Sequence, residues 1–348
     1  MLFWGKEKSI EPDKIEENIE KKIGIDWRAN KLRFVEVEER KSSKLIIKAG
    51  IWNLPEERDL KVLIEEEKRN KIISSLKQFN NLYELQDSKI NISLPSKFVK
   101  IDLINILSSD DIENKKNEVI NNIYGDNKYN YNIDTYEIKD SNKNILKILI
   151  VGCNNKLVNS TISIFNKSDF DVKSVNVNCF NLQNIIENIF TPKNDEISFI
   201  LDIYPKEIEF VTTIGNNFYK IETLPLIKPK INESIDEPLI IKNEITAFND
   251  LGEEYFNALS NALIKKINIT KKKIEEEENT TYYSKIYVCG SITKIDKFME
   301  IFDMASDNKI KKVNPFTNIK ISDSFTDREN IINESSEYTL ATSLVLTT

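Results

Sequence analysis

Two acidic residues are the best candidates for chemistry, because each follows an apolar, strand-like segment and precedes a turn into a second such segment. They are Asp26, within residues 23–37, and Asp202, within residues 199–211. The order of strand, acid, turn and strand thus occurs twice, about 176 residues apart. An internal repeat of this kind predicts a duplicated fold in which the two acids correspond to each other.

The turns after these acids lack the small residues that would let backbone N–H groups approach a phosphate. Residues 27–29 are Trp-Arg-Ala, and residues 204–205 are Tyr-Pro, whose proline has no N–H to donate. A third turn, after the strand-like segment 285–289, keeps only Gly290 before Ser291. The chain has 8 glycines in 348 residues, about a third of the usual proportion. The sequence therefore predicts that the hairpins persist while a phosphate-binding backbone is largely lost.

Composition excludes several kinds of site. The chain has no histidine, so Ser-His-Asp and Cys-His catalysis and histidine-containing zinc sites are excluded, and we assign no metal ligand. Cys153, Cys179 and Cys289 lie in apolar stretches without paired spacing, as expected for buried thiols in a reducing cytoplasm. A net charge of −7 argues against nucleic-acid binding. No apolar run approaches the roughly 20 residues that a membrane span needs.

Five parts are expected along the chain. They are a charged N-terminal leader (1–22), the first part of a first lobe (23–96), an inserted α/β subdomain (97–178), a helix and linker returning to the main fold (179–194), and a second lobe including the C-terminal helix (195–348). Apolar spacing predicts a helix over about 59–80. We expect the strand 172–177 to close the insert, and Phe316 to pack under the second lobe.

Five features, weak singly, are specific in their order and spacing. They are a Met-Leu-Phe start before a lysine-rich leader, Gly24-Ile25-Asp26, an insert ending at 172–177, Leu201-Asp202-Ile203, and Val313-Asn314-Pro315-Phe316. With these, residues 20–348 resemble the PilM family, actin-like cytoplasmic proteins of type IV pilus assembly. FtsA-like cell-division proteins share the insert, but the long linker and terminal amphipathic helix of those relatives do not follow Val345.

The resemblance implies an α/β, actin-like (ribonuclease H-like) fold with two duplicated lobes and an inserted α/β subdomain. It further implies a cytoplasmic scaffold at the inner-membrane face of a type IV pilus or type II secretion machine, without a membrane span of its own. In PilM the cytoplasmic N-terminal peptide of the membrane protein PilN lies between the first lobe and the insert. A similar groove is expected here near residues 90–94 and the inserted strands. Other pilus or secretion ATPase components are further candidate partners.

ATP-using members of the superfamily hold phosphate at these turns, and an acid there holds a metal-bound water. The corresponding positions form a degenerate nucleotide site here: Asp26, Asn30, Lys31, Asp202, Gly290 and Ser291. We assign no catalytic residue and expect no cofactor, with Mg-ATP left open as an alternative. If the acids only maintain the fold, Asp26 and Asp202 should each cap or bridge its own turn. The competing interpretations are an actin-like ATPase or kinase, and a polymerising actin-like filament protein.

Overall fold

The computed structural model describes residues 19–40, 43–59, 63, 65–86, 88–107, 111–139, 145–226, 248–307, 309–323, 325 and 328–346. Most of the expected leader lies outside these residues. No helix among the described residues is long and apolar enough to cross a membrane. The three cysteines are free and buried, as the sequence predicts.

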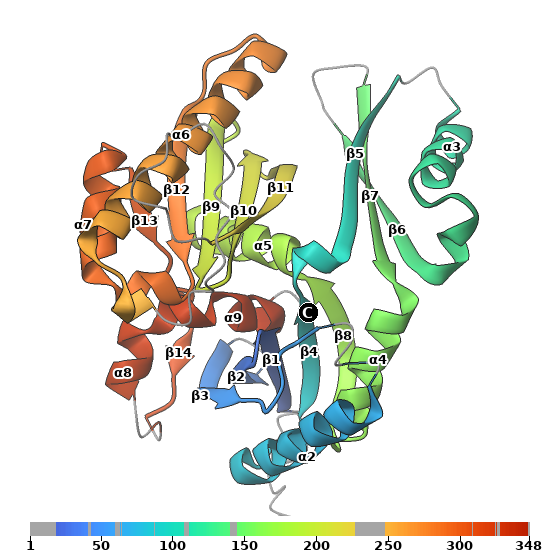
Figure 1. Ribbon diagram of the computed structural model, residues 1–348, viewed down its shortest axis with the longest axis vertical. Helices are drawn as coiled ribbons and strands as arrows, with labels where there is room; N and C mark the ends of the chain where they lie inside the picture. Colours follow the sequence, from blue (N-terminus) through green and yellow to red (C-terminus); the bar gives the residue numbers. More distant parts are fainter. Residues whose placement is uncertain are drawn as a thin grey trace, which may run out of the picture.

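The strands and helices follow one another along the chain as in Figure 1. The strands are β1 (Glu20–Arg28), β2 (Lys31–Arg40), β3 (Ser43–Asn53), β4 (Lys89–Leu94), β5 (Val99–Leu107), β6 (Tyr131–Lys139), β7 (Ile145–Asn154), β8 (Asp171–Val177), β9 (Glu196–Tyr204), β10 (Glu207–Ile214), β11 (Asn217–Pro225), β12 (Tyr283–Cys289), β13 (Ile310–Lys312) and β14 (Lys320–Ile321). The helices are α2 (Glu66–Tyr83), α3 (Ile112–Tyr124), α4 (Asn155–Asn166), α5 (Asn178–Phe190), α6 (Glu253–Glu278), α7 (Asp296–Ala305), α8 (Arg328–Asn333) and α9 (Thr339–Leu346).

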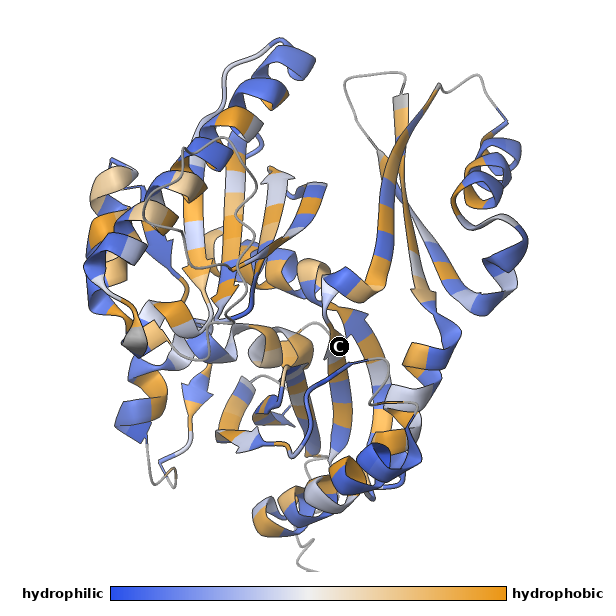
Figure 2. Ribbon diagram, in the orientation of Figure 1, coloured by the Kyte–Doolittle hydropathy of each residue, from blue (hydrophilic) through white to orange (hydrophobic). Residues whose placement is uncertain are grey.

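Two large sheets, each with helices packed on it, form the two lobes in Figure 1. In the described part of the chain the first sheet has the order β14-β3-β2-β1-β4-β8, and the second has the order β11-β10-β9-β12-β13. Side chains of α2 and α4 contribute to the core of the first lobe. Side chains of α6 and α7 contribute to that of the second. Figure 2 shows that the far end of α6, with its lysine and glutamate run, is hydrophilic.

The predicted duplication is visible in how the strands pair. In the first sheet an antiparallel β1-β2-β3 meander is joined by β4, which runs parallel to β1. In the second sheet β9-β10-β11 forms the same meander, and β12 runs parallel to β9. The strands β1 and β9 therefore hold equivalent central places in their lobes.

The insert has its own three-stranded sheet, in the order β5-β7-β6, with α3 packed on one face. This sheet agrees with the α/β character expected of the insert. The expectation that residues 172–177 close this unit was wrong, because β8 pairs parallel with β4 in the first lobe's sheet. Part of the other face of the insert packs against α5 and the second sheet, as one cluster includes Ile101, Val151 and Phe218.

Two further local expectations concern a helix and Phe316. The helix expected over about 59–80 includes α2, which continues to Tyr83; Leu63 is also helical, and residues 60–62 and 64 lie outside the described residues. Phe316 is buried as expected, but it packs with Val37 and Ile46 of the first lobe and stacks on Tyr338, not under the second lobe. The last part of the chain thus returns to the first lobe.

The C-terminal helix α9 lies between the two lobes (Figure 1), where it contacts β1 and α5. Gly24 on β1 makes this approach possible. A Cβ atom at position 24 would lie only 1.8 Å from the carbonyl oxygen of Ala341 on α9. The small residue in the Gly24-Ile25-Asp26 motif is therefore required for helix packing.

Replacing Gly24 by serine should lower the free energy of unfolding by about 1–3 kcal/mol or more, because α9 must move away from β1. Urea unfolding measures this change. The matched control is Gly252→Ser, since a Cβ at position 252 meets nothing within 4 Å and serine is a favourable N-cap for α6. Equal losses in the two variants would contradict the close contact between β1 and α9.

Candidate functional site

The two hairpins place their acids at matching positions. Asp26 lies two residues before the end of β1, and Asp202 lies two residues before the end of β9. The last residues of these strands are Arg28 and Tyr204. Successive side chains of a strand point to opposite faces, so residues two apart share a face. Asp26 with Arg28, and Asp202 with Tyr204, can therefore act together.

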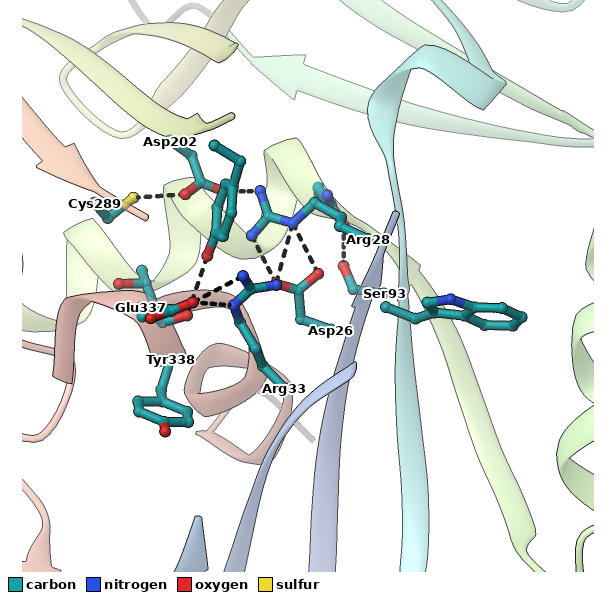
Figure 3. Close-up of polar contacts among 12 residues, drawn as sticks. Asp26, Arg28, Arg33, Ser93, Asp202, Cys289, Glu337 and Tyr338 are labelled. Atoms are coloured by element: carbon teal, nitrogen blue, oxygen red, sulfur yellow. Dashed lines mark hydrogen bonds and ion pairs between the residues drawn. The ribbon is translucent and has the colours of Figure 1, made fainter. Parts of the chain in front are cut away.

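Arg28 lies between the two acids and pairs with both, as Figure 3 shows. Its Nη2 is 2.6 Å from Oδ2 of Asp26, and its Nε is 2.9 Å from Oδ1 of the same carboxylate. Its Nη1 donates to Oδ2 of Asp202 at 2.5 Å. The exposed fractions of Asp26, Arg28 and Asp202 are 1%, 4% and 1%. One buried guanidinium thus joins the first lobe to the second.

Tyr204 and Arg33 extend this contact towards the C-terminal part of the chain. The guanidinium carbons of Arg28 and Arg33 lie 3.7 and 4.3 Å from the centre of the Tyr204 ring, distances typical of cation–π contacts. Arg33 donates to Oε1 of Glu337 at 2.8 Å, and the Tyr204 hydroxyl donates to the Glu337 carbonyl oxygen at 3.1 Å. Lys294 pairs with the other Glu337 oxygen at 2.5 Å.

These contacts determine the charge states of the cluster. Burial alone would lower the pKa of Arg28, but Asp202 and Asp26 outweigh it and raise that pKa well above its ordinary value. For Glu337 burial alone would raise the pKa, but Arg33 and Lys294 reverse the effect and hold that pKa below its ordinary value. The arginines and Glu337 are therefore charged in the folded protein.

Glu209, which pairs with Asp202 across the β9-β10 hairpin, forms a second contact between the lobes. Its Oε1 accepts from the backbone N–H of Ser96 at 3.0 Å and from Nδ2 of Asn178 at 2.9 Å. Ser96 follows β4 where the chain enters the insert, and Asn178 begins α5 where it enters the second lobe. Burial raises the pKa of Glu209 to about 8.

The six sequence-predicted site residues do not form one cluster. Asp26 and Asp202 meet at Arg28. The expectation that each acid caps or bridges its own turn agrees with Asp26, which pairs with Arg28 two residues on, but was wrong for Asp202, which pairs with Arg28 of the other lobe. Gly290 lies beside them: with φ +86°, its Cβ position is 2.8 Å from Oδ1 of Asp202, which leaves no room for a side chain. Asn30 and Lys31 are exposed at the β1–β2 turn and are not part of the buried cluster, although Lys31 pairs with Arg28 across the hairpin.

Ser291 follows Gly290, and its hydroxyl oxygen is buried without a hydrogen-bond partner among the described residues.

The sequence analysis missed the residues that complete the cluster: Arg28, Arg33, Tyr204, Glu209 and Glu337. One feature of the sequence could have identified Arg28: it lies two residues after Asp26 on a β-strand, so the two side chains share a face. We had interpreted that arginine only as the loss of a small residue.

The residues present do not fit a metal-bound nucleotide between the two acids. A divalent cation binds through carboxylate oxygens, and here both carboxylates are hydrogen-bonded to the guanidinium of Arg28. An arginine stays charged at any pH that a protein tolerates, so a second cation would have to displace it. No step of nucleotide chemistry follows from this arrangement.

The groove expected near residues 90–94 is not found at that strand. β4 has β1 on one side and β8 on the other, and residues 90–94 are buried. Its edges and side chains are therefore not available to a peptide. A surface hollow of about 710 Å³ lies elsewhere, between the end of β3 and α2, and is lined in part by Trp52 and Gln78.

Replacing Asp202 by alanine should lower the free energy of unfolding by about 3–5 kcal/mol, because it leaves a buried arginine with one partner fewer. Chemical denaturation measures the loss. Glu118→Ala, which removes an exposed pair with Lys115 on α3, is the control and should change it by less than about 0.5 kcal/mol. Unchanged stability in Asp202→Ala, together with loss of a measured nucleotide affinity, would show that the acid serves a ligand.

Glu209→Gln tests the buried carboxyl group through pH. The ordinary pKa is 4.5 and the folded value is about 8, so between these pH values the unfolded chain loses a proton that the native chain keeps. The stability of the wild type relative to Glu209→Gln should therefore fall as the pH rises from 4.5 to about 8 and level off above it. A difference that is constant over this interval would mean that Glu209 is ionised in the folded protein.

Comparison with known proteins supports the fold. No family model and no curated protein matches the sequence. A chain of the PilM-PilN type IV pilus biogenesis complex matches the structure with a TM-score of 0.68 and 12% identity, over 93% of this chain and 97% of that one.

Two other solved structures are more distant. A Bacteroides thetaiotaomicron protein with an actin-like ATPase fold has a TM-score of 0.46 and 8% identity, over 94% of this chain and 96% of that one. The cytoplasmic domain of EpsL, an inner membrane component of the type II secretion system of Vibrio cholerae, has a TM-score of 0.45 and 8% identity, over 94% and 95%. The predicted duplicated α/β architecture is confirmed, and the chain has the fold seen in the PilM-PilN complex.

Proposed function

We propose that this chain is a non-catalytic scaffold at the cytoplasmic face of an inner-membrane complex that assembles a type IV pilus or a related secretion machine. In this proposal it binds the cytoplasmic N-terminal peptide of a PilN-like membrane protein, and other pilus or secretion ATPase components are further partners. The observation that carries the proposal is the similarity to the PilM-PilN complex over 93% of the chain.

The cluster around Arg28 supports the non-catalytic part of the proposal. An actin-like ATPase or kinase would need Asp26 and Asp202 to be available to a metal ion and its phosphate. Both acids instead pair with Arg28 in a buried contact, at 2.6 and 2.5 Å. The same contact holds the lobes together without a nucleotide, which suits a protein whose role is to present a fixed surface.

Peptide binding that is independent of nucleotide tests the proposal. A labelled peptide from the cytoplasmic N-terminus of the membrane partner should bind with the same affinity, within about threefold, with and without Mg-ATP. A nucleotide that does not favour one lobe arrangement over another cannot change the affinity for a peptide. Fluorescence anisotropy on the purified chain measures both affinities.

A scrambled peptide of the same composition is the control for binding through charge alone. Equal affinity for the scrambled peptide would overturn the partner assignment. A tenfold rise in peptide affinity on adding Mg-ATP corresponds to about 1.4 kcal/mol of coupling free energy and would show that the nucleotide and peptide sites are coupled. That result would favour the ATPase alternative over the scaffold.

A further inference from the structure

We propose that Arg28 is an internal cation that fixes the arrangement of the two lobes, in the place where a ligand would otherwise be needed to join them. The interlobe clamp, as we call it, consists of Asp26, Arg28, Tyr204 and Asp202. The first two residues belong to β1 and the last two to β9. This inference does not depend on the peptide partner.

The first argument is electrostatic. Asp26 and Asp202 are both almost fully buried, with exposed fractions of 1% each, and they come from opposite lobes. Two buried carboxylates at one place repel each other and cannot both stay ionised without a cation between them. Arg28 supplies that cation from within the chain, and it is buried to the same degree, with an exposed fraction of 4%.

The second argument is geometric. Two nitrogens of Arg28 bond to Asp26, at 2.9 and 2.6 Å, so the guanidinium is oriented by its own lobe. The remaining Nη1 then reaches Asp202 of the other lobe at 2.5 Å. The Tyr204 ring, 3.7 Å from the guanidinium carbon, adds a further contact. A planar group held in this way has little freedom to leave Asp202.

The third argument is that opening would expose more than one unfavourable group. Glu209 of the second lobe bonds to Ser96, where the chain leaves β4 for the insert, and to Asn178, where it leaves β8 for α5. The carbonyl oxygen of Glu337, beside the first lobe near the start of α9, accepts from the Tyr204 hydroxyl of the second lobe. Separating the lobes would break the clamp together with these buried contacts. Contacts within the chain therefore fix how the two lobes lie against each other.

Removal of Arg28 should convert the clamp into a cation-dependent contact. In Arg28→Ala the two carboxylates lose their counter-ion, and Mg²⁺, which is commonly held by one or two carboxylates together with water, can take its place. We expect Tm to fall by about 6 °C or more in EDTA, and to recover in part in millimolar Mg²⁺. The wild type should show the same Tm in both buffers.

Arg33→Ala is the matched control, because it removes a buried arginine from the same cluster but leaves Asp26 and Asp202 paired with Arg28. Its Tm should fall without any response to Mg²⁺. A Tm of Arg28→Ala that responds no more to Mg²⁺ than that of Arg33→Ala would overturn the proposal. A decrease in the Tm of Arg28→Ala by less than about 2 °C would also overturn the proposal.

A distance measurement keeps the proposal testable if Arg28→Ala does not fold. Lys77→Cys on α2 and Lys272→Cys on α6 place spin labels on exposed positions of the two lobes, while the three native cysteines are buried. The otherwise wild-type chain should give one narrow distance distribution that Mg-ATP leaves unchanged. Arg28→Lys, which keeps one charge but cannot contact both acids with the same geometry, should broaden it. Two populations without ligand, or a shift on adding Mg-ATP, would show that the lobes are not fixed by Arg28.

Discussion

The contact on which the arrangement of the lobes depends is the pairing of one guanidinium with two buried carboxylates from opposite sides. Breaking a buried ion pair leaves an uncompensated charge, which costs far more than loss of a surface pair. Arg28 therefore cannot leave Asp202 without a large penalty unless something else neutralises that acid. The contact also explains why the turns after Asp26 and Asp202 need no glycine: the side chain of Arg28 fills the space between the two acids.

Duplication explains why these particular residues meet. β1 and β9 occupy equivalent places, so their last residues, Arg28 and Tyr204, face each other, as do their acids. The charges of the surrounding cluster then balance, with three cations opposite three anions: Arg28, Arg33 and Lys294 opposite Asp26, Asp202 and Glu337. Glu209 has no ion-pair partner among the described residues, and burial outweighs the attraction of Arg28 and raises the pKa of Glu209 to about 8.

The sequence was informative where structure depends on local patterns. The alternation of apolar residues and the repeated acid predicted the β1-β2 and β9-β10 hairpins, and apolar spacing predicted the helix that contains α2. The sequence was less informative where the structure depends on residues that are distant along the chain. The strand at 172–177 was found, but its pattern could not show that it pairs with β4 and not with the insert. Likewise, Asp202 lies 174 residues from Arg28 in sequence, and nothing local to either residue indicates that they touch.

The misinterpretation of Arg28 has a general physical cause. A large charged residue in a turn reads as a solvated side chain, because arginine is rarely buried without a partner. Here the partners are created by the fold: one carboxylate two residues away, and another brought across the interface by duplication. A ligand can shift an equilibrium between lobe arrangements only by its differential affinity for them. Because both acids are already paired, a cationic ligand must first replace Arg28. The free-energy cost of that replacement lowers the affinity of the ligand for the arrangement in which the lobes are joined. If the proposed clamp holds, the pairing of the two acids with Arg28 therefore makes the lobe arrangement insensitive to such a ligand.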